Sequence, residues 1–307
     1  MVYSANPGNP ALCLALSQQS AVAPGSPTCG PFGESTTYIT AAGQTIQGTR
    51  QGLGPAFAND DYSSSAGNSA YNALEASLRH NGKNVSFLIG YTFSKSMDQA
   101  SSISDTANPY NLRLTRALSA FDLTHNFVAS YQWQLPFDRI FSHARAITAG
   151  WQLSGITRLS TGFPVTLHSD GDNSLMGSLP NGVNNHSLDL PDYNGGPLNL
   201  NGNPRNGLPY FNTSDYSMNA LGTPGSASRR SFHGPGAINF DLALLKNTPL
   251  GESRNLQFRL EAFNAFNHTQ FFGPAAVNGG ISDPALFGQV VKAASPRLVQ
   301  LAVKLTF

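Results

Sequence analysis

Hydrophobic and polar residues alternate one by one along several segments of the chain, which is the period of a β-strand and not of an α-helix. In the C-terminal segment one face carries Val299, Leu301, Val303, Leu305 and Phe307. The same alternation predicts seven strands, at about residues 71–80, 83–94, 122–135, 147–160, 237–247, 255–266 and 296–307. The pattern therefore indicates an all-β, antiparallel protein.

The predicted strands are long, close to the roughly 9–11 residues that a tilted strand needs to cross a bilayer. Strands of soluble proteins are shorter, about 5–6 residues on average. The face opposite the apolar one carries small uncharged residues and a few widely spaced charges, which are Arg79, Arg158, Asp241, Arg259, Glu261 and Lys304. We interpret the strands as a segment of a transmembrane β-barrel and these charges as lumen-facing. There they would pair with one another across neighbouring strands, or contact a plug and the transport path.

The connections between the predicted strands alternate in length. Counted backward from Phe307 they cover about residues 267–295, 247–255, 170–236, 136–145, 95–121 and the pair Asn81-Gly82, which is a type I′ hairpin signal. Every second connection is long, as in outer-membrane barrels, whose periplasmic turns are short and whose extracellular loops are longer. We therefore expect the Phe307 end of the last strand to be periplasmic, with Trp133 and Trp151 near the same membrane interface.

Two regions follow from this pattern: an extracellular loop region over residues 1–70 and the C-terminal part of the barrel over residues 71–307. The first region contains both cysteines of the chain, Cys13 and Cys29, within a stretch rich in Pro, Gly and Ser. Outside the cytoplasm the two thiols could form a disulfide, and two unrelated free thiols are the alternative.

The amino-acid composition also supports a transmembrane β-barrel. Charged residues make up 11% of the chain, against about 25% in a typical soluble domain. The net charge of +1 and the lack of a dense basic cluster argue against a nucleic-acid partner. The sequence contains no apolar run long enough for a transmembrane helix, and the first residues do not resemble a signal peptide.

The sequence contains only weak candidates for catalytic, metal-binding or ligand-binding motifs. The seven histidines show no metal-ligand spacing, and we expect neither enzymatic activity nor a cofactor. Asp170, Asp172 and Asn173 form the best candidate for a calcium site, with a plain polar turn as the alternative. The adjacent pair Arg229-Arg230 could bind lipopolysaccharide phosphates or a ligand, but we expect a solvated loop end there.

Several motifs resemble a known family. They are Tyr71-Asn72-Ala73-Leu74, Gly90-Tyr91-Thr92-Phe93-Ser94-Lys95-Ser96-Met97-Asp98, Phe121-Asp122-Leu123-Thr124-His125-Asn126-Phe127, Gly150-Trp151-Gln152-Leu153-Ser154-Gly155 and Phe258-Arg259-Leu260-Glu261-Ala262-Phe263-Asn264-Ala265-Phe266-Asn267-His268. In order and spacing they are similar to the Oar-like TonB-dependent receptors of the outer membrane, which carry a carboxypeptidase-regulatory-like domain. The resemblance extends over the whole chain.

The resemblance implies a 22-stranded barrel with an N-terminal plug, energised by the TonB complex. The chain lacks a plug-like region and a Ton box, so we expect it to be the C-terminal portion of a longer receptor, contacting TonB through the missing N-terminal part. The terminal Phe307 matches the aromatic residue that the barrel-assembly machinery recognises in this family. Lipid and lipopolysaccharide of a Gram-negative outer membrane would be its other partners.

The sequence thus predicts the barrel portion of a receptor for active uptake of an unidentified ligand. One alternative is an adhesion or structural barrel without transport. The other is a secreted β-sandwich lectin or enzyme, because a soluble sheet also alternates.

Overall fold

The structure is a computed structural model of the 307-residue chain. It describes residues 2–4, 6, 8–9, 37–39, 45–47, 52–53, 61–63, 65–102, 105, 108, 111–140, 144–171, 173–176, 189–251 and 253–307.

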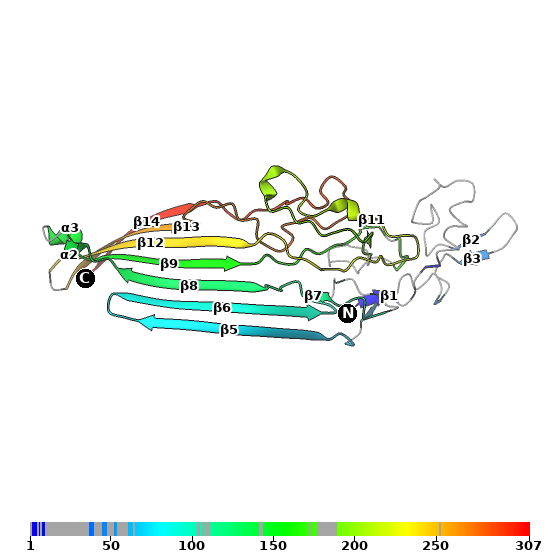
Figure 1. Ribbon diagram of the computed structural model, residues 1–307, viewed down its shortest axis with the longest axis horizontal. Helices are drawn as coiled ribbons and strands as arrows, with labels where there is room; N and C mark the ends of the chain where they lie inside the picture. Colours follow the sequence, from blue (N-terminus) through cyan, green and yellow to red (C-terminus); the bar gives the residue numbers. More distant parts are fainter. Residues whose placement is uncertain are drawn as a thin grey trace.

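One antiparallel sheet dominates the molecule (Figure 1). Its long strands are β5 (Ser69–Asn81), β6 (Val85–Asp98), β8 (His125–Gln134), β9 (Trp151–Ser160), β12 (Ala237–Pro249), β13 (Asn255–Phe263) and β14 (Leu298–Thr306). Each pairs with its neighbour in the sequence of long strands, in the order β14-β13-β12-β9-β8-β6-β5. The short strand β7 (Ala117–Leu118) adds to β6. This up-and-down order confirms the all-β, antiparallel fold.

The remaining elements are short. Three two-stranded sheets pair β1 (Val2–Ser4) with β4 (Asp61–Ser63), β2 (Thr37–Ile39) with β3 (Thr45–Gln47), and β10 (Asp192–Tyr193) with β11 (Tyr216–Ser217). The helices in the described part of the chain are α2 (Phe137–Ile140), α3 (Arg145–Thr148), η3 (Pro204–Asn206) and η4 (Thr213–Asp215). No helix in the described part of the chain is long and apolar enough to cross a membrane.

The register of the sheet separates two faces. Residues that pair across antiparallel strands lie on the same face, and so do residues two apart along a strand. Followed through the pairs Leu78–Ile89, Ile89–Ala129, Ala129–Thr157, Phe240–Thr157, Leu244–Leu260 and Leu260–Leu301, one face collects the apolar side chains. Much of this apolar face is exposed, up to 79% at Leu301, as expected for a surface that contacts lipid and not water.

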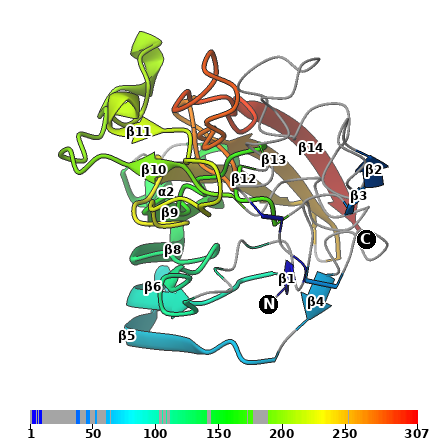
Figure 2. The same cartoon turned by 90° about the vertical axis from the view of Figure 1, so that its right-hand side faces the viewer.

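Seen along its strands, the sheet curves into an open arc with β5 and β14 at its two edges (Figure 2). As far as the structure describes them, the long connections at 99–124, 161–236 and 264–297 gather at one end, whereas 82–84, 135–150 and 250–254 lie at the other end with the C-terminus (Figure 1). The predicted alternation of long and short connections is therefore present in the fold. Because extracellular loops are the long ones, the end with the long connections is the extracellular end.

Strand limits differ from the predicted ones where local structure intervenes. β6 continues to Asp98, four residues beyond its predicted end, because its extracellular half pairs with β5 and β7. β9 begins at Trp151 and not at residue 147, because helix α3 extends to Thr148 and the chain turns at Gly150, which has a positive φ of 79°. β13 ends at Phe263, since Asn264 takes a positive φ of 49° and turns the chain away.

The predicted Asn81-Gly82 hairpin turn is wrong. Asn81 pairs with Ser86 and the Gly82 amide donates to the Val85 carbonyl at 2.8 Å, so Lys83 and Asn84 form the turn. A type I′ turn requires positive φ at both central residues, and neither pair has it. The shift leaves Leu78 on the apolar face, so the face assignment is unchanged.

Candidate functional site

The extracellular connections fold into a body with its own core. Its centre is a cluster of aromatic rings in which Phe211 contacts Tyr216, Phe232 and Phe287, with ring centroids 5.1–5.5 Å apart. Val165 and Leu167 are buried in the same cluster. We call these packed connections, residues 99–124, 161–236 and 264–297 as far as the structure describes them, the loop body.

A charge cluster of four side chains joins two connections of the loop body. Arg229 donates to Asp98 at 2.7 Å and pairs with Asp105 at 3.0 Å, and Arg230 pairs with Asp105 at 2.5 Å. All four side chains are at most 5% exposed. Arg229 also donates to the backbone carbonyls of Asp98 and Gln99, so its guanidinium holds the end of β6. The cluster ties the 99–124 connection to the 161–236 connection.

The charge cluster is neutral in sum, since two guanidinium groups face two carboxylates. Burial alone would raise the pKa of Asp105, but the hydrogen bond and charge of Arg230 and the charge of Arg229 outweigh it and hold that pKa below its ordinary value. The prediction of a solvated loop end at Arg229-Arg230 is wrong, because both residues are buried. Their charges are balanced internally, so they are not presented to lipopolysaccharide phosphates on the surface.

A further buried carboxylate, Asp122, lies outside the charge cluster and connects the sheet to the loop body. It accepts from the Ser96 amide at 2.5 Å and from Nε2 of His233 at 2.8 Å. The Thr124 hydroxyl reaches the same Nε2 at 3.5 Å. In a catalytic triad the carboxylate and the hydroxyl bind different nitrogens of the histidine ring. Here both groups contact the same nitrogen of His233, so they do not form such a relay. The arrangement therefore fits a structural clamp between β6 and the 161–236 connection.

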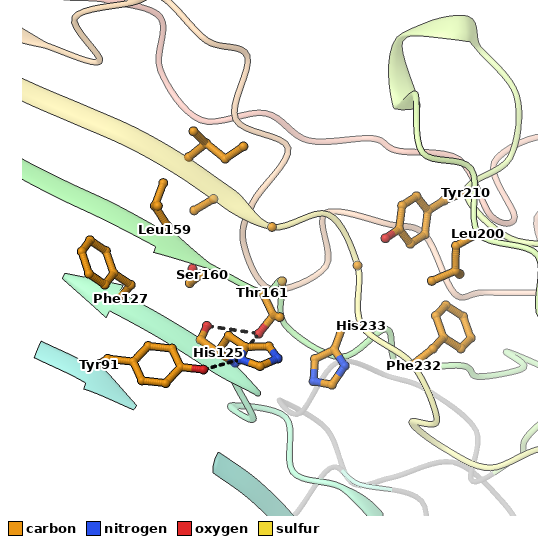
Figure 3. A pocket seen from close by; sticks show the side chains of 15 residues that line it. Tyr91, His125, Phe127, Leu159, Ser160, Thr161, Leu200, Tyr210, Phe232 and His233 are labelled. Carbon is orange, nitrogen blue, oxygen red and sulfur yellow. Dashed lines mark hydrogen bonds between the residues drawn. The ribbon is translucent and has the colours of Figure 1, made fainter. Parts of the chain in front are cut away.

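A groove of about 790 Å³ lies where the apolar face of the sheet meets the loop body. Figure 3 shows Tyr91, Phe127 and Leu159 on the strand side and Leu200, Tyr210 and Phe232 on the loop side. Between them the Tyr91 hydroxyl hydrogen-bonds Nδ1 of His125 at 2.8 Å, and Oγ1 of Thr161 accepts from the His125 amide at 3.2 Å. We call this space the rim groove.

The six charged residues expected on the lumen side share one face of the sheet. Arg158 pairs in register with Asn239, two residues from Asp241, and the pairs Ala243–Glu261 and Gln257–Lys304 carry the face onward to β14. On the other side, Arg158 pairs with Val128, Val128 with Gly90, and Gly90 with Ser77, which lies two residues from Arg79. All six therefore lie opposite the apolar face, which is the lumen side in an outer-membrane barrel.

Their contacts differ from the cross-strand ion pairs that we expected. Arg259 and Glu261 pair along a single strand at 2.8 Å. The guanidinium of Arg158 lies over the ring of Phe272, 4.9 Å from its centroid. Asp241 accepts from the Asn264 amide at 2.8 Å, which secures the turn that follows β13.

Other predicted site residues are placed only in part. Cys13 and Cys29 lie outside the described residues, and so does Asp172 of the calcium candidate. Asp170 lies 3.7 Å from His168, and the Asn173 amide donates to the Asn219 carbonyl at 2.6 Å. Among the described residues no group of three His, Cys, Asp or Glu side chains could hold a metal ion. The calcium site and the disulfide stay predictions.

Neither the charge cluster nor the rim groove follows from the sequence pattern. The partners in the cluster are up to 131 residues apart, so no local pattern connects them. One signal was available: an adjacent pair of arginines stands out in a chain with only 11% charged residues.

A single curved antiparallel sheet, with one exposed apolar face, one polar face and its long connections at one end, defines a transmembrane β-barrel protein. Comparison with known families agrees, since the model of the outer membrane beta barrel domain matches residues 4–300. The chain belongs to this family, and the protein is located in the outer membrane of a Gram-negative bacterium. No curated protein and no solved structure matches the chain. The family and the single dominant sheet speak against the alternative of a secreted β-sandwich.

Proposed function

We propose that the chain forms the C-terminal part of the barrel of an Oar-like TonB-dependent receptor that takes up a ligand actively. The observation that carries the proposal is the polar face, on which charged residues, including the six named above, are distributed over β5, β9, β12, β13 and β14. Small barrels fill their interior with packed side chains. Separated charges on a broad polar face suit a wide, hydrated lumen that holds a plug or passes a polar ligand.

The open edges of the sheet support a barrel larger than the seven long strands. Unpaired backbone groups at β5 and β14 would be costly in lipid, so both edges need partner strands for closure. The 22 strands that the family resemblance implies would supply them.

Residues in the motifs that carry the resemblance have structural roles in this fold. Asp122 clamps β6 to the loop body, and Asn264 bonds His268 through both its amide nitrogen and its oxygen to end β13. Gly150 has a positive φ of 79°, and a Cβ there would collide with the Asn247 carbonyl. In this proposal the loop body captures the ligand, and the protein acts by binding and transport without catalysis.

The proposal is tested by binding to TonB. The natural protein, purified in detergent from its own outer membrane, is titrated with the purified periplasmic domain of TonB in a calorimeter. Saturable binding is expected. Absence of binding would contradict TonB-dependent uptake and favour the alternative of an adhesion or structural barrel, for which the ordered loop body would be the adhesive surface.

A further inference from the structure

A further cavity, of about 350 Å³, lies between two connections of the loop body. It is lined by residues within 108–116 of the first connection and by residues 190 and 224–229 of the second, and no described residue lines both this cavity and the rim groove. Its volume is near the lower end of the range for small-molecule sites, roughly 300–1,000 Å³. We call this space the arginine pocket, because its lining includes Arg113, Arg116 and Arg229.

The arginine pocket carries an excess of positive charge. Arg113 and Arg116 are exposed, and within the described part of the chain neither forms an ion pair. Nη1 of Arg116 donates to the side-chain oxygen of Asn68 at 3.3 Å, which is a neutral acceptor. No acidic residue is among the described residues that line the pocket. Because the buried charge cluster to which Arg229 belongs is neutral in sum, two positive charges remain unbalanced at this site.

Arg229 adds a buried donor that lacks an acceptor. Its Nη atoms pair with Asp98 and Asp105, but its Nε–H is buried without a hydrogen-bond partner among the described residues. The Arg229 side chain is 2% exposed and lines the pocket. A buried N–H without an acceptor is unfavourable. An oxygen atom of a molecule bound in the pocket would supply the missing acceptor.

The wall formed by residues 224–228 is fixed by backbone contacts. The Ala227 amide donates to the Pro191 carbonyl at 3.0 Å, and the Ser226 amide donates to the Asp192 carboxylate at 2.9 Å. Gly225 has a positive φ of 85°, and a Cβ there would collide with a backbone carbonyl of the neighbouring segment. The pocket is therefore formed before any molecule binds, which lowers the entropic cost of binding.

From these observations we propose that the arginine pocket binds a phosphate group, carried by a small soluble ligand or by the headgroup of an outer-leaflet lipid. Arginine suits phosphate because its planar guanidinium donates two parallel hydrogen bonds to the oxygens and keeps its charge. A phosphate of about two negative charges matches the charges of Arg113 and Arg116, and one of its oxygens accepts from Nε of Arg229. The proposal does not rest on transport, so it is tested separately from binding to TonB.

The experiment measures how fast individual arginines react with phenylglyoxal. The natural protein, purified free of lipopolysaccharide in a detergent without phosphate, is treated with the reagent at increasing concentrations of inorganic phosphate. Sodium chloride keeps the ionic strength constant, and mass spectrometry of the peptides quantifies each modified arginine. The internal reference is Arg205, which is also exposed and lies in the 161–236 connection but is not among the residues that line the pocket.

Bound phosphate should slow the modification of Arg113 and Arg116 severalfold and leave Arg205 unchanged. In Arg113→Gln the phosphate concentration that half-protects Arg116 should rise severalfold, whereas the matched control Arg205→Gln should leave it as in the natural chain. Lipopolysaccharide is then added in place of inorganic phosphate. Protection at a lower phosphate concentration assigns the site to a lipid headgroup, and weaker or absent protection assigns it to a soluble ligand.

Two results overturn the proposal. One is that neither inorganic phosphate nor lipopolysaccharide slows the modification of Arg113 and Arg116. The other is that Arg205 is protected to the same degree, which would show a general effect of the anion on exposed arginines.

Discussion

The sheet and the loop body differ in how they shield their hydrophobic side chains from water. Every residue of β14 is exposed, and the apolar face of the sheet is largely uncovered by protein. Most buried hydrophobic residues, such as Phe211 and Leu167, belong instead to the irregular loop body. In a soluble protein strands form the core and loops cover it. The reversal shows that the sheet relies on lipid for its apolar face, whereas the loop body needs a core because water surrounds it.

The two regions also treat charge differently. On the sheet, charged residues such as Arg259 stay partly exposed on the polar face. In the loop body Arg229 and Asp105 are buried together, and the pair is stable only because each charge has a partner. The effect of a substitution should therefore depend on which of the two regions it lies in.

The largest effect is expected from Asp105→Ala. The change leaves Arg230 without its carboxylate and Arg229 with Asp98 alone, and breaking a buried pair in this way typically costs about 3–5 kcal/mol. Hydrogen exchange of the loop-body amides in the reconstituted protein measures the loss, which should leave the strands protected.

The matched control is Asp138→Ala, which removes an exposed ion pair of 3.9 Å with Arg145 at the other end of the sheet. Such pairs contribute roughly 0–1 kcal/mol. Equal effects of the two substitutions would show that the charge cluster does not hold the loop body together.

A charge on the lipid side of the sheet should have the next largest effect. Leu260→Arg places a guanidinium on the apolar face, where the cost near the bilayer midplane is about 2–4 kcal/mol. Gln300→Arg is the control, because Gln300 pairs in register with Glu261 on the polar face. Equilibrium unfolding in lipid vesicles compares the two variants, and a neutral Leu260→Arg would reverse the assignment of the faces.

Acid should loosen the loop body before the sheet, with a smaller effect than either substitution. The folded pKa of Asp105 lies below its unfolded value. Its contribution is therefore complete above the ordinary aspartate pKa, about 3.9, and is lost as the pH falls through the lower folded pKa. Hydrogen exchange against pH should show this loss in the native chain and not in Asp105→Ala. An identical acid profile in both would assign the transition to other groups.

The sheet could be predicted from the sequence and the loop body could not, for a physical reason. Alternation is local, since neighbours such as Leu260 and Glu261 point to opposite faces whatever the rest of the chain does. The alternation predicted the strands, their order and their two faces. The charge cluster depends on a contact between Asp98 and Arg229, which are 131 positions apart in the sequence, and such a distant contact leaves no periodic pattern.

The hairpin shows the limit of local signals within the sheet itself. Asn81-Gly82 is a strong turn motif, yet the turn forms at Lys83 and Asn84. Both registers keep Leu78 on the apolar face, so alternation alone cannot choose between them.

The central claim is that the strands cross the outer membrane with the loop body outside and the short connections inside. It is tested most directly by labelling intact cells with a polyethylene-glycol maleimide too large to cross the outer membrane. In a chain with Cys13 and Cys29 replaced by Ser, Leu208→Cys lies on the exposed surface of the 161–236 connection, and Ser253→Cys lies in the exposed short connection after β12. We predict that Leu208→Cys is labelled on intact cells and Ser253→Cys only after permeabilisation. Labelling of Ser253→Cys on intact cells, with Leu208→Cys protected, would contradict the proposed orientation.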